Sequence, residues 1–432
     1  MPNCGAGVRM LRTMPSVRSL LVAVLVCTAS GVRAQEAAKP AQDGNAPAVQ
    51  KTPDEPAMDG RTQYPKFMEN SFFTFSVGMI GYRFNQRQLE PGFQAESIDY
   101  RRAAVRVDLF GHRFTKYLSA QAVYMRPAWF IQYNNINGTT DTRQVSNAYA
   151  GATLALNIPI TSKVSAYGEG GGGITSRSGA IINGKVALPG AHYTSGMLGA
   201  GFDIQTSRTL DLMLSATYLP GRESFAQPST RMFTAGLRYH MRTVPDAAVE
   251  ENRSSGYVFP ANMIRVGFTT NSLGYGMNGL FSKRIPIFWG GRVETRHGVT
   301  IDYQRNVFHT KKVFAFDLGA SGSLWLSDGD SDSFGTISGY PMFRFFFVRS
   351  RTADLYFNYS IAGPTFISQS VIDSQDTGAR FTFQDFMGIG TLLGRDHRFN
   401  AEIGIKHYSN GNLFTANRSV KVPLTFSIGY TF

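Results

Sequence analysis

Apolar and polar residues alternate along two stretches of the chain, and each stretch divides into about eight segments of strand length. Side chains on a β-strand point alternately to opposite faces, so a period of two predicts strands with one apolar and one polar face. The expected strands of the first stretch are 72–84, 100–114, 117–127, 144–159, 163–176, 191–206, 208–221 and 231–242. Those of the second are 261–269, 290–306, 311–327, 335–349, 353–368, 380–393, 398–409 and 420–432.

The last expected strand shows the alternation most clearly. One face would carry Val422, Leu424, Phe426, Ile428, Tyr430 and Phe432, and the other Lys421, Thr425, Ser427, Gly429 and Thr431. The first face suits lipid and the second a polar interior, which is the pattern of a transmembrane β-barrel. Tight turns also alternate with long polar segments such as 134–143. Outer-membrane barrels have short turns at one end and long loops at the other.

A polar segment at 243–256, which contains Pro245, separates the two halves. The expected fold class is therefore all-β, with two tandem antiparallel eight-stranded transmembrane β-barrels over 71–242 and 257–432. Eight strands are enough to close a barrel whose interior is filled by side chains. The alternative is one larger barrel in which 243–256 is an internal connection.

The chain begins like a secretory signal peptide over 1–34. The features are basic Arg9, Arg12 and Arg18, a short apolar core at 20–29, and a small-residue cleavage site at 32–34. That core is too short to span a bilayer as a helix. Residues 35–70 follow as an expected disordered linker, because their composition favours Ala, Pro, Asp, Gln and Lys over large apolar residues.

Composition and charge narrow the function. Aromatic residues make up 13% of the chain and glycines number 45, which fits short strands with aromatic girdles. Both cysteines, Cys4 and Cys27, lie in the leader, so the mature chain has no disulfide or thiolate chemistry. The net charge is +13, of which four positive charges lie in the leader. The basic residues are scattered among aromatics without a nucleic-acid motif, so they favour an anionic membrane surface over nucleic acid.

The expected strand 398–409 carries the candidate chemistry. One face holds Ala401, Ile403, Ile405, His407 and Ser409, and the other Glu402, Gly404, Lys406 and Tyr408. The charged face should line the interior, so His407 and Ser409 should point outward, next to lipid. A histidine beside a serine can activate it as a nucleophile. Both termini of such a barrel are periplasmic, so this strand ends at the outer leaflet, where the amphiphile is lipopolysaccharide.

The sequence around this pair resembles a known family. His407, Tyr408, Ser409, Asn410, Gly411, Asn412 and Leu413, followed by Asn417 and a terminal strand, resemble the signature of the lipid A 3-O-deacylases. These are outer-membrane serine esterases, also called acyloxyacyl hydrolases. The resemblance covers 257–432 and is sharpest over 380–432. It implies that Ser409 is the nucleophile and His407 its base, with no metal or cofactor. It also implies that Asn410, Gly411 and Asn417 position the base or form the oxyanion pocket.

The sequence departs from the family in one respect. Some members carry a glutamate near the start of the last strand that orients the histidine, but here 417–422 reads NRSVKV and no acid follows His407. Three alternatives follow from this difference: another group orients the base, the Ser–His pair works without an acid, or the activity is lost. Asp385 is one candidate, because a simple hairpin with its turn near Arg395 would place it opposite His407 on the same face. Asp385 could equally turn inward through a bulge or cap the aromatic girdle.

Two functions from different classes therefore remain. The leading hypothesis is an esterase that removes a fatty acyl chain from lipid A. The alternative is a non-catalytic barrel that acts as an anchor, a pore or a recognition protein.

Elsewhere, the glycine run 168–173 lacks the Lys-Ser/Thr of a phosphate loop, so we expect close strand packing there. Asp328, Asp330 and Asp332 lack the downstream glutamate of a calcium loop and predict an acidic surface loop.

Overall fold

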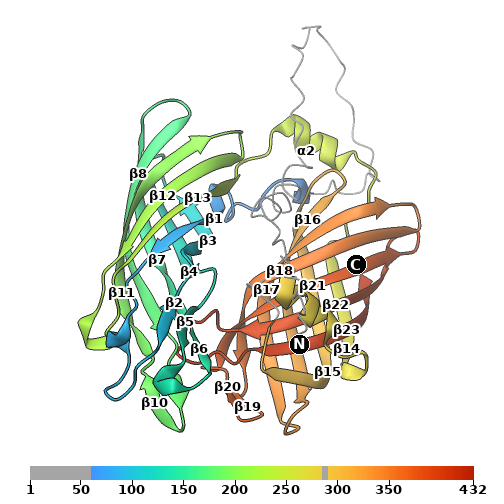
Figure 1. Ribbon diagram of the computed structural model, residues 1–432. Helices are drawn as coiled ribbons and strands as arrows, with labels where there is room; N and C mark the ends of the chain where they lie inside the picture. The colour runs from blue at the N-terminus through green and yellow to red at the C-terminus, as the bar shows by residue number, and fades with distance from the viewer. Residues whose placement is uncertain (1–59, 285–289) are drawn as a thin grey trace, which may run out of the picture. The chain divides into compact units, whose positions relative to one another are not determined.

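The computed structural model describes residues 60–284 and 290–432. Within this part, the chain folds into two closed antiparallel β-barrels of eight strands each (Figure 1). The expected signal peptide, both cysteines and residues 35–59 of the expected linker lie outside the described residues. Residues 60–70 contain the short 3₁₀ helix η1 (Gly60–Thr62), and Thr62 and Met68 are buried. No helix among the described residues is long and apolar enough to cross a membrane.

The first barrel has the strand order β1-β13-β12-β11-β8-β7-β4-β3 and closes by pairing of β3 with β1. Its strands are β1 (Ser71–Gly81), β3 (Ala103–Arg113), β4 (Leu118–Pro127), β7 (Asn147–Pro159), β8 (Val164–Arg177), β11 (Ala191–Gln205), β12 (Leu210–Leu219) and β13 (Thr230–Met241). Each corresponds to one expected strand. Glycines at 171 and 173 lie so close to the β7 backbone that a Cβ would stand 2.0 and 2.2 Å from a carbonyl oxygen, as the packing explanation of 168–173 requires.

Buried ionic and polar groups fill the interior of the first barrel. The Glu169 carboxylate accepts hydrogen bonds from Arg106, Gln121 and Thr153, and Arg238 pairs with Asp203 at 2.5 Å. An eight-stranded barrel has room only for such side chains. This filling disfavours an open pore through the first half.

Short strands that the alternation did not predict order the long loops of the first barrel. β2 (Ser97–Asp99), β5 (Ile131–Asn134) and β6 (Thr142–Val145) form a three-stranded sheet, and β9 (Ala180–Ile182) pairs with β10 (Lys185–Leu188). Apolar residues of these loops join residues of the barrel strands in one buried cluster that includes Ile131, Ile136 and Leu188. These loops therefore have a hydrophobic core of their own.

The second barrel has the order β14-β15-β16-β17-β18-β21-β22-β23, and β23 pairs back onto β14. Its strands are β14 (Asn262–Thr270), β15 (Val293–His309), β16 (Phe314–Ser327), β17 (Ser333–Arg349), β18 (Ala353–Ile367), β21 (Phe381–Leu393), β22 (Phe399–Ser409) and β23 (Val420–Thr431). β13 pairs only with β1 and β12, whereas β14 pairs only with β15 and β23. The expectation of two separate barrels is confirmed, and the alternative of one larger barrel is wrong. The connection 243–256 contains helix α2 (Asp246–Arg253).

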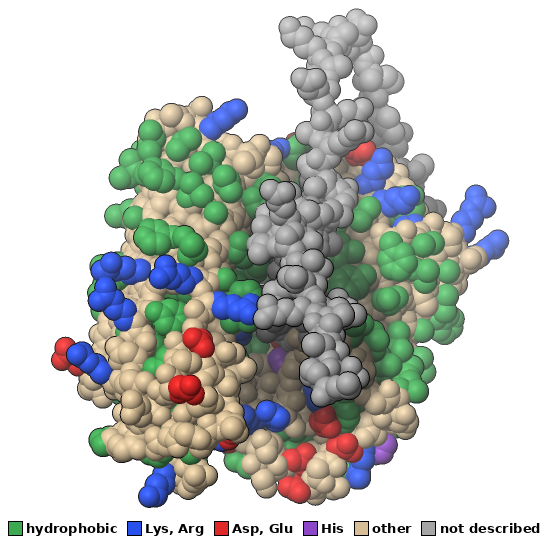
Figure 2. All heavy atoms as spheres, viewed as in Figure 1, with side chains coloured by type: hydrophobic (Ala, Val, Ile, Leu, Met, Phe, Trp, Pro, Cys, Tyr) green, Lys and Arg blue, Asp and Glu red, His purple; other side chains and the backbone are tan. Residues whose placement is uncertain are grey.

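The two faces of β22 differ as the alternation predicted. Inside the barrel, Glu402 accepts hydrogen bonds from Arg265, from Tyr356 at 2.9 Å and from Asn358 at 2.6 Å. Lys406 lies 3.6 Å from Asp302. On the outer surface, exposed apolar side chains cover the strands of both barrels, as the green areas of Figure 2 illustrate. Such an apolar outer band is the surface that a lipid bilayer covers.

The lengths of the connections orient the second barrel in the membrane. At one end the turns are short, at 310–313, 350–352 and 394–398. At the other end the loops 271–292, 368–380 and 410–419 are long and contain α3 (Gly276–Arg284), β19 (Val371–Ile372) and β20 (Gln375–Asp376). Long loops are extracellular in outer-membrane barrels. Ser409, at the end of β22, therefore lies at the outer-leaflet side.

The start of β23 differs from the expected alternation. The pairing register with β22 shifts between Gly404–Thr425 and Lys406–Val422, so an extra residue bulges from β23 next to Pro423. Val420 and Val422 are consequently buried in a cluster with Tyr408, and Lys421 lies on the outer face. The expectation that Val422 faces lipid and Lys421 the interior is wrong, because a bulge exchanges the two faces beyond it. From Phe426 to Phe432 the expected outward residues are exposed.

Candidate functional site

The hairpin of β21 and β22 brings a histidine and a carboxylate together on its outer face. Asp385 is the direct cross-strand neighbour of His407, and Phe383 that of Ser409. The Nδ1 atom of His407 lies 3.2 Å from Asp385 Oδ2, and each residue is only 4% exposed. This is the relation between base and acid in a catalytic triad.

A bulge in the neighbouring strand holds the Asp385 carboxylate in place. The register between β18 and β21 shifts between Ser360 and Gly363, and the N–H of Ala362 donates to Asp385 Oδ1 at 2.9 Å. Ala362 has a φ of +55°, which is uncommon for a residue with a side chain. Burying a charge is costly unless it is paired and hydrogen-bonded. The bulge and the imidazole together meet that requirement, and the sequence carried no signal for the bulge.

The Ser409 hydroxyl is held by the turn that follows it. Asn417 Nδ2 donates to Ser409 Oγ at 3.0 Å, and the backbone N–H of Gly411 donates to the same atom at 3.2 Å. Asn417 Oδ1 accepts from the backbone N–H of Asn410 at 3.2 Å. Gly411 and Asn412 adopt φ values of +65° and +60°, so the chain turns sharply here. The turn therefore collects hydrogen-bond donors around the oxygen of Ser409.

The side chain of Asn410 has a different task from that of Asn417. Its Nδ2 donates to Thr377 O at 2.7 Å and to Ala416 O at 2.8 Å, so it ties loop 368–380 to loop 410–419. Gly378 completes this contact: it has a φ of +102°, and a Cβ there would stand 2.3 Å from Ala416 O. Only glycine permits so close an approach. Sequence reasoning did not single out Gly378, because its role depends on a loop distant in the chain.

On the other side of His407, the site carries a cation instead of an acid. Lys421 is the cross-strand neighbour of His407 on β23 and forms an ion pair with Glu294 at 2.5 Å. Its Nζ also lies 5.1 Å from the ring centroid of Tyr275. Tyr275 donates to Thr295 O at 2.8 Å, and burial raises the pKa of this phenol, so it stays protonated at neutral pH. The two flanks of His407 therefore carry opposite charges.

An acidic group in the extracellular loops could in principle hold a cation. Asp330, Asp332 and Asp373 place oxygen atoms within 4.8 Å of one another. However, Asp373 accepts hydrogen bonds from the backbone N–H groups of Gly329 and Asp330, at 3.2 and 2.7 Å. Asp373 therefore holds loop 328–332 in place by hydrogen bonds, as in an acidic surface loop.

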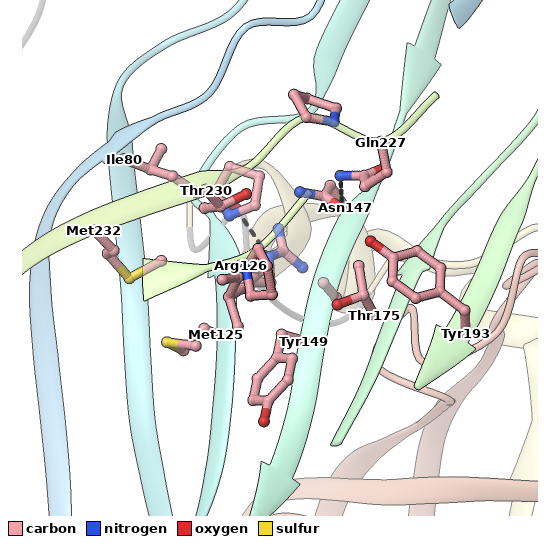
Figure 3. A pocket seen from close by; sticks show the side chains of 15 residues that line it. Ile80, Met125, Arg126, Asn147, Tyr149, Thr175, Tyr193, Gln227, Thr230 and Met232 are labelled. Atoms are coloured by element: carbon pink, nitrogen blue, oxygen red, sulfur yellow. Dashed lines mark hydrogen bonds between the residues drawn. The ribbon is translucent and has the colours of Figure 1, made fainter. Parts of the chain in front are cut away.

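A small pocket lies among the strands and loops of the first barrel. Figure 3 shows a pocket whose lining includes Met125, Tyr149 and Met232, with Asn147 hydrogen-bonded to Gln227 at 3.3 Å. Its free space of about 10 Å³ is at the lower limit for one water molecule. His240 of the first barrel is buried and forms a hydrogen bond with Asp211 at 2.6 Å.

Fold and surface together define an integral β-barrel protein of a bacterial outer membrane. Within it, residues 290–431 match the family model described as lipid A 3-O-deacylase (PagL), so the resemblance of the C-terminal half to that family is confirmed. This match covers β15 to β23 and hence Asp385, His407 and Ser409. No curated protein sequence matches the chain.

Solved outer-membrane barrels are similar to parts of the chain at low identity. They include the outer-membrane enzyme PagL (16% identity, TM-score 0.27, 39% of this chain and 97% of that one). Neisserial surface protein A has 11% identity and a TM-score of 0.28, with 40% of this chain and 97% of that one covered. The N-terminal β-barrel domain of Pseudomonas aeruginosa OprF gives 13% identity and a TM-score of 0.25, with 40% and 97% covered.

Proposed function

We propose that the second barrel is a serine esterase that removes an ester-linked fatty acyl chain from lipid A of lipopolysaccharide. One observation carries the proposal: Asp385, His407 and Ser409 lie on the lipid-facing side of one hairpin, at the extracellular end of the barrel. A nucleophile there can reach only an outer-leaflet amphiphile. The family match over 290–431 supports the same substrate.

In the proposed mechanism, His407 Nε2 takes the proton of Ser409, and Oγ attacks the ester carbonyl carbon. The tetrahedral intermediate collapses and expels the sugar oxygen, which takes the proton back from His407. A water molecule, deprotonated by His407, then hydrolyses the acyl-enzyme and releases the fatty acid. Asp385 holds the imidazole and stabilises its protonated form. No cofactor enters these steps.

The donors beside Ser409 are suited to stabilise the developing oxyanion. The Gly411 N–H and the Asn417 amide donate to Oγ, 3.2 and 3.0 Å away, and would turn to the carbonyl oxygen of the attacked ester as that oxygen becomes negative. Preorganised donors of this kind stabilise the transition state more than the ground state. Asn410 acts by positioning, since its amide holds the two loops together. The proton transfer requires the Ser409 hydroxyl to turn towards His407, two residues earlier on the same face.

The test is mass spectrometry of lipid A from cells that produce the full chain. The wild-type protein should yield lipid A that lacks one acyl chain, and Ser409→Ala should leave lipid A intact. Ser419→Ala is the matched control, because the hydroxyl of this half-buried serine in the same loop donates to the Gly290 carbonyl and not to the candidate site. Assembly of each variant is checked by heat-modifiable electrophoretic mobility. Unchanged deacylation by an assembled Ser409→Ala chain would contradict the proposal.

A further inference from the structure

A second feature of the outer face lies away from the candidate catalytic hairpin. An open groove of about 430 Å³ follows the extracellular ends of β14, β15, β16 and β17. Its lining includes Phe268, His297, Val299, Leu324, Ser333 and Gly335. We call it the flank groove. In the closed order of eight strands β16 is four strands from β22, so the groove and Ser409 lie on different sides of the barrel.

A missing side chain and a stacked ring shape this groove. Gly335 lies opposite Leu324 in the sheet and has no side chain to fill the outer surface. A Cβ at Gly335 would meet its nearest atom, in Leu324, at an ordinary 3.5 Å, so the position has room for a side chain. On the opposite wall, the ring of His297 is stacked with Phe268 at a centroid distance of 6.4 Å.

The flank groove lies at the boundary between apolar and polar surroundings. Towards the membrane it continues into the lipid-facing band, where Val299 and Leu324 are 50% and 67% exposed. Towards the extracellular end its rim carries Ser333 and Ser368, and His297 adds a ring nitrogen. An occupant must therefore combine an apolar chain with a polar head at the outer surface.

We propose that the flank groove binds one acyl chain of an outer-leaflet lipopolysaccharide. Water does not fill an apolar groove at hydrocarbon depth, and an empty groove would forfeit dispersion contacts along its walls. A lipid chain gains no hydrophobic energy by leaving other lipid chains, so shape and polar contacts must select the occupant. The hydroxyls of Ser333 and Ser368 and the ring of His297 supply those contacts to a hydroxylated sugar head. Binding at this site does not depend on the chemistry of Ser409.

The test uses the full chain in the Ser409→Ala background, which removes the proposed nucleophile, and the mass of each bound lipid shows separately whether that lipid is intact. The protein is reconstituted in phosphatidylethanolamine and phosphatidylglycerol with a small fraction of lipopolysaccharide, and retained lipids are counted by native mass spectrometry. Gly335→Phe should lower the retained lipopolysaccharide by one molecule per chain. Gly339→Phe should lower it by none, because Gly339 is on the same face of β17 with nothing within 4 Å and outside the groove.

A second pair of variants keeps the test decisive. Gly335→Leu introduces a smaller side chain into the groove, and it is used in place of Gly335→Phe if the larger ring prevents assembly of the barrel. His297→Ala should reduce the preference for lipopolysaccharide over phosphatidylglycerol at least several-fold. Equal lipopolysaccharide retention by the glycine variants at 335 and 339, or retention of phospholipid in its place by the parent chain, would overturn the proposal. Neither result would bear on deacylation by the wild-type protein.

Discussion

A carboxylate on the outer face of a membrane barrel needs partners, because hydrocarbon offers it no hydrogen bonds. Asp385 has two: the imidazole of His407 at 3.2 Å and the N–H of Ala362 at 2.9 Å. A purely structural aspartate would face the interior, where the charged network of Glu402 lies. Its outward position opposite His407 is therefore the residue-level reason to assign it the role of the acid.

The first prediction concerns this acid. Asp385→Asn should lower turnover by roughly 10²- to 10⁴-fold, because the amide cannot stabilise the protonated imidazole and favours the wrong tautomer. KM should change little, since Asp385 touches His407 and not the acyl chain. Steady-state kinetics on purified, folded protein with a lipid A substrate give both values.

The control for that measurement is Asp396→Asn, an exposed carboxylate in the turn of the same hairpin. It should retain wild-type turnover. An Asp385→Asn enzyme with an unchanged rate would remove the acid from the mechanism and leave a Ser–His pair supported by Asn417.

At this scale, counting along the hairpin placed Asp385 opposite His407 as one of two open interpretations, because a two-residue period and a short turn determine register. The same counting failed at Lys421, where one extra residue exchanges the faces of β23. It also could not find Ala362, since a bulge in β18 depends on which residues β21 presents to it. Bulges arise from tertiary pairing and leave no local sequence pattern.

At the scale of elements, the site depends on the contact between loops 368–380 and 410–419. Gly378→Ala should disrupt it, because the new Cβ would stand 2.3 Å from Ala416 O and the φ of +102° disfavours any side chain. Activity should fall at least 10-fold through displacement of the Asn410–Asn417 turn, while the barrel still assembles. Turnover and heat-modifiable mobility, measured on the same sample, separate the two effects.

Gly394→Ala is the matched comparison for Gly378. Gly394 also has a positive φ, of +91°, but nothing lies within 4 Å of its Cβ position. Both variants carry backbone strain, and only Gly378→Ala carries the clash. Equal activities in the two variants would show that the loop contact is unimportant for the site.

The sixteen barrel strands could be predicted because each buries one face along its whole length, which imposes alternation on the sequence. The loop strands β2, β5, β6, β9 and β10 could not. Each of them has only three or four residues. Their stability comes from the cluster around Ile131 and Leu188 and not from their own pattern.

For the whole molecule, each barrel has its own buried carboxylate at the centre of a hydrogen-bond network. Glu169 serves the first barrel and Glu402 the second. Removing one partner of a buried ionic network costs about 3–5 kcal/mol. Glu169→Ala should therefore destabilise the first barrel and preserve deacylation, whereas Glu402→Ala should destabilise the second barrel and reduce deacylation at elevated temperature.

Limited proteolysis at increasing temperature measures this separation, because the connection 243–256 lies between the barrels and the two fragments differ in mass. The Glu169→Ala chain should lose its first fragment earlier than the wild type does, with the second unchanged. Simultaneous loss of both fragments would mean that the two barrels unfold as one cooperative unit.

The polar row of Asp385, His407 and Lys421 also has a consequence for the bilayer. It interrupts the apolar surface of β21 to β23 below the exposed ring of Phe381, whereas on the side of Leu324 the apolar surface continues to the strand ends. The hydrophobic thickness of the second barrel is thus smaller on the catalytic side. A membrane meets such a mismatch by thinning locally or by tilting the protein. Either response would lower the sugar–acyl boundary of the outer leaflet towards Ser409, and under the proposed function it would bring the ester bond to this serine without extracting the lipid.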